Sequence, residues 1–134
     1  YEYPNEKDVV PKREVSFEEA GKLCEKQGKR LCTVDEWKWG CSGLEGNTYP
    51  YGHSFEENTC NTSGAKGVMA SGSRPNCVSK FGLFDMTGNV FEWVVDKDGK
   101  PMLMGGPVSK CETVSPGMDG RAKPLTGFRC CKSN

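Results

Sequence analysis

The chain has 134 residues, of which 35% are hydrophobic, and it contains 17 glycines and 8 prolines. This length and composition predict a single domain over residues 1–134, with many loops and few long helices. Eighteen lysines and arginines balance eighteen aspartates and glutamates. The net charge therefore gives no reason to expect nucleic acid or anionic lipid as a partner. No apolar run approaches the roughly 20 residues of a membrane-spanning helix.

Eight cysteines are a high number for a chain of this size, and they are spread from Cys24 to Cys131. No two of them form a CxxC pattern, which argues against a zinc ribbon or a redox motif. We therefore expect disulfides and an extracytoplasmic location, either periplasmic, at the cell surface or secreted. The alternative is a cytosolic protein with buried free thiols. Because the chain begins with Tyr1 and not with Met, we expect it to be processed or excised. A signal peptide or lipid anchor could have been removed in that step.

Two short helices are predicted in the first third of the chain. The first begins with a capping box at Ser16 and Glu19, in which each side chain bonds the backbone N–H of the other residue, and it ends near Gly28. The second begins with the same arrangement at Thr33 and Glu36. Each helix has an apolar face that we expect to point into the core. These faces are Phe17, Ala20 and Cys24, with Leu23 beside them, and Val34, Trp37 and Cys41.

The remaining segments predict short strands joined by long loops. Gly, Asn, Ser and Pro dominate the loops, and periodicity is lost there. In chain order the segments are a lead-in strand (1–12), an irregular loop (42–80), a compact aromatic segment (81–93), a strand (101–108), a loop (115–126) and a closing strand (128–131). The predicted fold class is α+β, with two short helices, short antiparallel strands and long ordered loops.

Four segments carry a resemblance to a known family. They are 16–37, which includes Gly28-Lys29-Arg30-Leu31 and Thr33-Val34-Asp35-Glu36-Trp37; Tyr49-Pro50-Tyr51-Gly52; 82–93, which reads Gly-Leu-Phe-Asp-Met-Thr-Gly-Asn-Val-Phe-Glu-Trp; and Gly105-Gly106 with Gly127-Phe128-Arg129-Cys130. In their order and spacing they resemble the formylglycine-generating enzyme (sulfatase-modifying factor) family. The resemblance covers about residues 1–131 and implies that family's C-type-lectin-like fold. Family members carry further strands at the front, so we expect an amino-terminal part of the fold to be absent here.

Most of these residues have a structural interpretation. We expect Trp37, Trp93, Phe84 and Phe91 to be core aromatics and Arg129 to be a buried ion-pair partner. Gly88, Gly105 and Gly106 are expected where the backbone needs positive φ or close approach. The single histidine, His53, has no Cys, His or carboxylate pair nearby, and we interpret it as an ordinary loop residue.

The resemblance implies copper chemistry for the active members of the family. Two cysteines just after a Gly-Gly-Ser strand bind copper there and oxidise a substrate cysteine to formylglycine. Sulfur ligands are needed because soft thiolates select Cu(I), and two of them are needed because linear coordination takes two ligands. Here Pro107 follows Gly105-Gly106 in place of Ser, and Cys111 is the only cysteine before Cys130. A single thiol cannot form that site, so we expect no copper and no catalytic residue.

Eight cysteines allow 105 pairings. The resemblance implies the pairs Cys24–Cys130 and Cys41–Cys111, since the spacing of these cysteines matches that of the family's structural cysteines. Cys130 and Cys131 are neighbours on a predicted strand and need different partners because their side chains point to opposite faces. Cys32 lies between the helices and is assigned to Cys131. Cys60 and Cys77 are expected to pair with each other and to close the irregular loop. The predicted pairs are Cys24–Cys130, Cys41–Cys111, Cys32–Cys131 and Cys60–Cys77.

A calcium ion is expected at the segment from Asp85 to Glu92, whose matching positions in the family form a structural calcium site. Calcium prefers carboxylate and carbonyl oxygens. By that resemblance, Asp85 and Glu92 supply side-chain oxygens, and Gly88 and Val90 supply carbonyl oxygens. The alternative is that the two carboxylates cap the turn and pair with Arg129 or a lysine.

Three classes of function remain open. We favour a non-catalytic recognition module that binds a protein, peptide or glycan through loops 95–100 and 112–126, on the family's substrate side. Plain solvent exposure is the alternative interpretation of these loops. The other classes are a copper-dependent oxidase that converts cysteine to formylglycine in sulfatases, and a structural component of the cell envelope.

Overall fold

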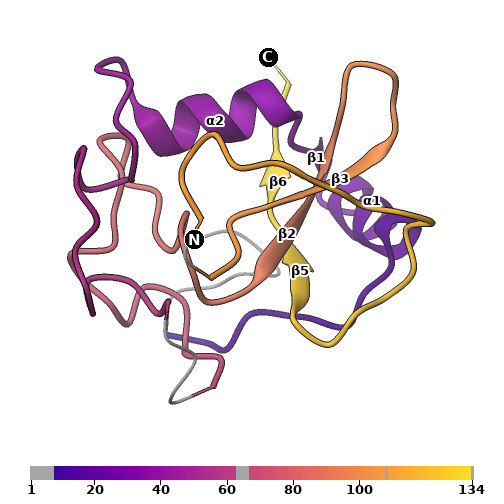
Figure 1. Cartoon of the computed structure of the whole chain (residues 1–134). Coiled ribbons are helices and arrows are strands. Elements are labelled where there is room, and N and C mark those ends of the chain that lie inside the picture. Colours follow the sequence, from indigo (N-terminus) through magenta and orange to yellow (C-terminus); the bar gives the residue numbers. More distant parts are fainter. Residues whose placement is uncertain (1–7, 63–66, 108, 134) are drawn as a thin grey trace.

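The computed structural model describes residues 8–62, 67–107 and 109–133, and Figure 1 shows their arrangement. The elements in chain order are α1 (Phe17–Glu25), β1 (Arg30–Leu31), α2 (Val34–Ser42), β2 (Phe91–Val95), β3 (Pro101–Met104), β4 (Ser115–Pro116), β5 (Thr126–Phe128) and β6 (Cys130–Cys131). Between α2 and β2 the described residues form loops without a helix or strand, which fill the left of Figure 1. Of the predicted lead-in strand, residues 1–7 lie outside the described residues, and residues 8–12 form no strand.

Both predicted helices form, and local signals define their ends. In α2 the capping box is complete, because Thr33 Oγ1 accepts from the Glu36 N–H and Glu36 Oε1 accepts from the Thr33 N–H. In α1 only one half forms: Ser16 Oγ accepts from the Glu19 N–H at 3.1 Å. Glu36 also accepts two hydrogen bonds from Arg30, at 2.6 and 2.8 Å. The Arg30 hydrogen bonds are the main cause that lowers the pKa of Glu36 to about 2.

The strands form two small sheets. One has the order β4-β3-β2-β5, in which β2 pairs antiparallel with β3 and parallel with β5, and the other joins β1 to β6. The parallel pairing of β2 with β5 corrects the expectation that the strands are antiparallel. The predicted closing strand is divided at Arg129, because residues 126–128 pair with β2 while residues 130–131 pair with β1. The predicted strand 101–108 ends at Met104, since Gly105 follows with a φ of +82°.

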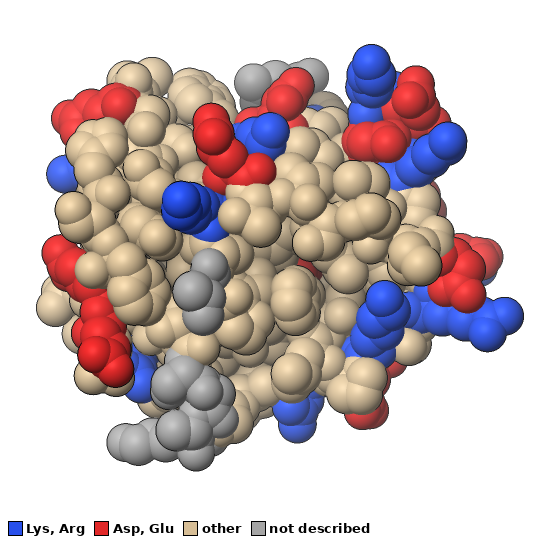
Figure 2. Space-filling view, viewed as in Figure 1, with Lys and Arg blue, Asp and Glu red and all other residues tan. Residues whose placement is uncertain are grey.

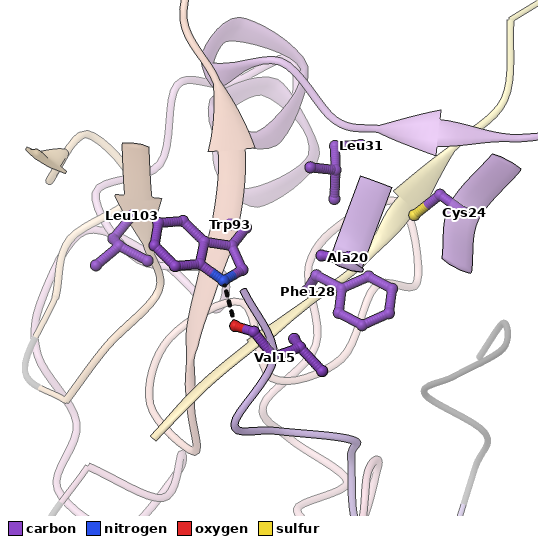
Figure 3. Close-up of a cluster of buried hydrophobic side chains, with 7 residues drawn as sticks. All are labelled: Val15, Ala20, Cys24, Leu31, Trp93, Leu103 and Phe128. Atoms are coloured by element: carbon purple, nitrogen blue, oxygen red, sulfur yellow. Dashed lines mark hydrogen bonds between the residues drawn. The ribbon is translucent and has the colours of Figure 1, made fainter. Parts of the chain in front are cut away.

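The core has two apolar clusters, one on each side of β2. The first joins α1 to β1, β2, β3 and β5, and Figure 3 shows the Trp93 indole at its centre, where Nε1 donates to Val15 O at 2.9 Å. The second packs α2 against β2 and β3. Trp37 and Trp93 are buried as predicted. Phe84 and Phe91 are only half-buried, and Phe91 packs against the first cluster.

All eight cysteines lie within the described residues and all are in disulfides. The pairs are the four expected from the sequence: Cys24–Cys130, Cys32–Cys131, Cys41–Cys111 and Cys60–Cys77. Three of them connect the helical first third of the chain with its C-terminal third, and the fourth closes the irregular loop. A chain with four disulfides is suited to an oxidising compartment. Among the described residues, no helix is long and apolar enough to cross a membrane.

Candidate functional site

A cavity of about 340 Å³ opens beside the predicted calcium segment. Three of the four predicted ligands, Asp85, Val90 and Glu92, contribute to its wall, whereas Gly88 does not. The full lining is Pro11, Ser71, Leu83, Phe84, Asp85, Asn89, Val90, Glu92, Arg129, Cys130 and Lys132. The structure therefore brings a turn, the start of β2 and the C-terminal segment to one wall.

Glu92 is the most enclosed charged group of this wall, with 2% of its surface exposed. Its Oε1 accepts from Arg129 Nε at 2.7 Å, and its Oε2 accepts from Trp37 Nε1 at 2.8 Å. Burial raises the pKa of the Glu92 carboxyl, while the charge and hydrogen bond of Arg129 and the bond from Trp37 oppose the rise. The prediction that Arg129 is an ion-pair partner is confirmed.

Asp85 stands at the opposite end of the segment, in a left-handed backbone conformation with a φ of 56°. Its Oδ2 accepts from the Gly72 N–H at 2.9 Å, and its Oδ1 has no hydrogen bond to the described residues. Burial raises the pKa of Asp85, and the Gly72 bond and the charges of Arg129 and Arg74 act against that rise. Hydrogen bonding in this site thus follows the alternative interpretation, in which one carboxylate caps a turn and the other pairs with Arg129.

The oxygen atoms of the wall nevertheless fit a hard cation. Two carboxylates, Asp85 and Glu92, lie in the same wall as two basic residues, Arg129 and Lys132, and each carboxylate oxygen retains a second lone pair. Gly88 has a φ of +80°, and a Cβ there would lie 2.5 Å from the Asn61 carbonyl oxygen, so the turn requires glycine. Among the described residues, no three His, Cys, Asp or Glu side chains cluster to hold a metal. Calcium would therefore depend on backbone carbonyls as well, and it remains a prediction.

The segment that carries copper ligands in active family members has another role in this structure. Gly105 approaches the Trp37 ring, where an added Cβ would lie 2.8 Å from Cζ2, and Gly106 packs against the Phe91 ring. Cys111 follows, completely buried and bonded to Cys41. Since every cysteine of the chain is in a disulfide, no thiol pair is available to bind Cu(I).

Two polar features of the site were not predicted from the sequence. Trp37 was expected only as a core aromatic, yet its N–H supplies one of the two hydrogen bonds on Glu92. The buried Oδ1 of Asn61 has no hydrogen-bond partner among the described residues, although the Asn61 amide nitrogen donates to Asn89 Oδ1 at 3.1 Å. Neither feature has a local sequence signal, because Glu92 lies 55 residues from Trp37 and Asn89 lies 28 residues from Asn61.

The profile of the family described as "Sulfatase-modifying factor enzyme 1-like domain" matches residues 3–133. The chain belongs to this family. A solved structure, PvdO from Pseudomonas aeruginosa, has the same fold, with a TM-score of 0.67 at 20% identity over 90% of this chain and 61% of that one. The family match and this structural neighbour therefore account for the α+β fold over nearly the whole chain.

Two relatives within this group are named as inactive. The "Inactive C-alpha-formylglycine-generating enzyme 2" of Mus musculus is 29% identical over 157 residues, which cover 96% of this chain and 51% of the relative. The protein of the same name from Bos taurus is 33% identical over 105 residues, which cover 69% of this chain and 35% of the relative. The chain thus spans about half or less of the length of these relatives. This chain itself is a domain of the sulfatase-modifying factor family in which no free thiol pair is left for catalysis.

Proposed function

We propose that this chain is a non-catalytic, extracytoplasmic recognition module that binds a protein, peptide or glycan through its loops. The observation that carries the proposal is the Cys41–Cys111 disulfide, because it uses the only cysteine between Gly105-Gly106 and Cys130. The four disulfides support a periplasmic, cell-surface or secreted location. A scaffold that has no reactive thiol retains its loops as the parts able to recognise a partner.

The two loops proposed for recognition are well ordered, which lowers the entropy lost on binding. At the tip of the β2–β3 hairpin, Asp96 Oδ1 accepts from the N–H groups of Asp98 and Lys100, both at 2.8 Å. In loop 112–126, Gly117 packs against Trp93 and against the Pro101 carbonyl. Both loops reach the right-hand side of Figure 1, next to α1. Ordered loops on one side of the fold support a recognition surface there.

The first test is catalytic. The purified chain is expected not to convert a cysteine-containing sulfatase peptide to formylglycine when copper is supplied, because no thiol pair can bind the metal. Mass spectrometry of the peptide measures the conversion, and an active formylglycine-generating enzyme serves as the positive control. Turnover above the level without protein would reject the proposal. A non-reduced digest that contains free thiols would reject its structural basis.

Calcium is proposed as a structural ion of the same domain. Asp85 and Glu92 would hold it with side-chain oxygens, and Gly88 and Val90 with carbonyl oxygens. A ligand that binds only the native state raises its stability by mass action, by about 2.7 kcal/mol at a concentration 100 times the Kd. We therefore expect millimolar calcium to raise the melting temperature of the parent. The melting temperature of the Asp85→Ala variant should not change when calcium is added. Asp98→Ala, which changes an exposed hairpin residue outside the cavity, is the matched control and should respond like the parent.

A further inference from the structure

A second concave site lies beside α1, on the far side of β2 from α2. It is a groove of about 380 Å³, near the lower end of the range of about 300–1,000 Å³ that is usual for ligand sites. Its lining is Phe17, Glu18, Gly21, Lys22, Glu25, Arg30, Leu31, Thr33 and Val95. Phe17, Leu31 and Val95 make part of its lining apolar, and four of the other residues are charged. Nothing in the family resemblance assigned a role to this groove.

Gly21 has no structural reason within the chain to be glycine. It lies inside α1, where alanine is more favourable than glycine, and it does not have the positive φ for which glycine is normally required. An added Cβ would meet no atom within 4 Å. Neither the backbone conformation nor internal packing therefore needs glycine at this position. The missing side chain instead leaves space open in the wall of the groove.

The charged residues of the groove leave one carboxylate without an ion pair. Lys22 Nζ pairs with Glu18 at 3.0 Å, and Arg30 holds Glu36 with two hydrogen bonds. Glu25 has no ion pair among the described residues, although it lies close enough to Lys22 to raise the pKa of that ammonium. The charges of the lining balance, but Arg30 is held by Glu36 outside the groove, so Glu25 is the carboxylate that remains for a ligand next to an apolar floor. Figure 2 shows that charged side chains lie mainly around the edge of the face drawn, and that its middle is mostly uncharged.

The groove adjoins both loops of the proposed recognition surface. Val95, in its wall, is the last residue before the tip of the β2–β3 hairpin. Phe17, in the opposite wall, donates its N–H to the Gly120 carbonyl at 2.9 Å. A polypeptide bound across the loops would therefore pass this groove.

We propose that the α1 groove binds a basic side chain, lysine or arginine, of an extended partner peptide. The aliphatic stem lies over Gly21 and Leu31, and the cationic head pairs with Glu25. An apolar neighbour in the peptide contacts Phe17 and Val95. This inference rests on the proposed function, for which it specifies the chemistry of the ligand. It also gives glycine at position 21 a physical reason.

The probe is the peptide acetyl-Leu-Arg-Leu-amide, titrated into the ¹⁵N-labelled full chain and followed by amide chemical shifts. Saturable shifts are expected at Gly21, Leu31 and Val95. Acetyl-Leu-Glu-Leu-amide should produce none, because it brings a second negative charge to Glu25. A flat titration with both peptides would overturn the proposal. Saturable shifts confined to loop 112–126 would also overturn it, while leaving loop recognition itself intact.

Variants of α1 separate binding from folding. Gly21→Leu fills the groove and should weaken binding of the arginine peptide at least tenfold. Glu25→Gln removes an exposed charge and should weaken binding by up to about fivefold. Leucine favours the helix more than glycine does, so the melting temperature of Gly21→Leu should not fall below that of the parent. Glu19→Gln changes an exposed carboxylate of the same helix outside the groove and should bind like the parent. Unchanged affinity in Gly21→Leu would contradict the proposal.

Discussion

Replacement of Arg129 by methionine is expected to lower the free energy of unfolding by about 3–5 kcal/mol, because it leaves Glu92 buried without its partner. Glu92 is 2% exposed and keeps only the hydrogen bond from Trp37 in this variant. Arg129 Nη2 also donates to the Phe84 carbonyl at 3.0 Å, so that contact with the turn is lost as well. Urea unfolding in the presence of a calcium chelator measures the change without interference from metal binding.

The matched control for this variant is Arg121→Met. Arg121 also pairs with a carboxylate, Asp119, at 2.9 Å, but the arginine side chain is 85% exposed. A pair in water contributes little, so the control should change stability by no more than about 0.5 kcal/mol. Similar losses in the two variants would show that burial of Glu92 is not what makes Arg129 important.

Removal of the Cys24–Cys130 disulfide is the second change with a large expected effect. Its cysteines are 106 positions apart, but the Cys32–Cys131 bond stays in place in this variant, so the loop that is released has only about 10 residues, for which loop-closure entropy gives about 2.7 kcal/mol. The Cys60–Cys77 bond spans 17 positions, for which the same relation gives about 3 kcal/mol. We therefore expect the double alanine variants at positions 24 and 130 and at positions 60 and 77 to lose similar stability.

Urea unfolding of both double variants, with the other three disulfides verified by peptide mapping, tests this similarity. Cys24, Cys60 and Cys77 are all buried, so both replacements also remove buried sulfur contacts. A variant at positions 24 and 130 that loses about 2 kcal/mol more than the other would contradict the prediction. It would indicate that the neighbouring Cys32–Cys131 bond does not restrict the unfolded chain in place of the missing one.

The helices were predicted well because their signals are local. Ser16 and Thr33 each lie three residues before the glutamate whose N–H they accept, so the sequence itself contains the motif. The shortest strands have no such signal. Residues 30–31 form β1 only because they meet residues 130–131, and a pair of residues is too short to show any periodicity. Similarly, β5 stops before Arg129 because Phe128 and Cys130, on either side of this arginine, belong to different sheets. Only the tertiary fold determines this division.

The candidate site was predicted in part for the same reason. Asp85 and Glu92 were identified because one short segment contains both carboxylates, and Arg129 because of the family motif that contains it. The indole N–H of Trp37 reaches Glu92 across 55 residues, and no sequence pattern distinguishes that tryptophan from an ordinary core residue. The α1 groove was not predicted at all. An unneeded glycine becomes apparent only when the space around it is known.

The adjacent cysteines 130 and 131 also determine how the fold would bear a mechanical load. They bond to Cys24 and Cys32, which flank the turn between α1 and β1. A pull on Lys132 therefore passes through covalent bonds into the first third of the chain before it loads the two-residue ladder between β1 and β6. In a force-extension experiment, tension between Lys132 and a point before Cys24 should not extend the roughly 100 residues in between until a reductant is added. This domain would thus behave as an inextensible link between Lys132 and the segment before Cys24.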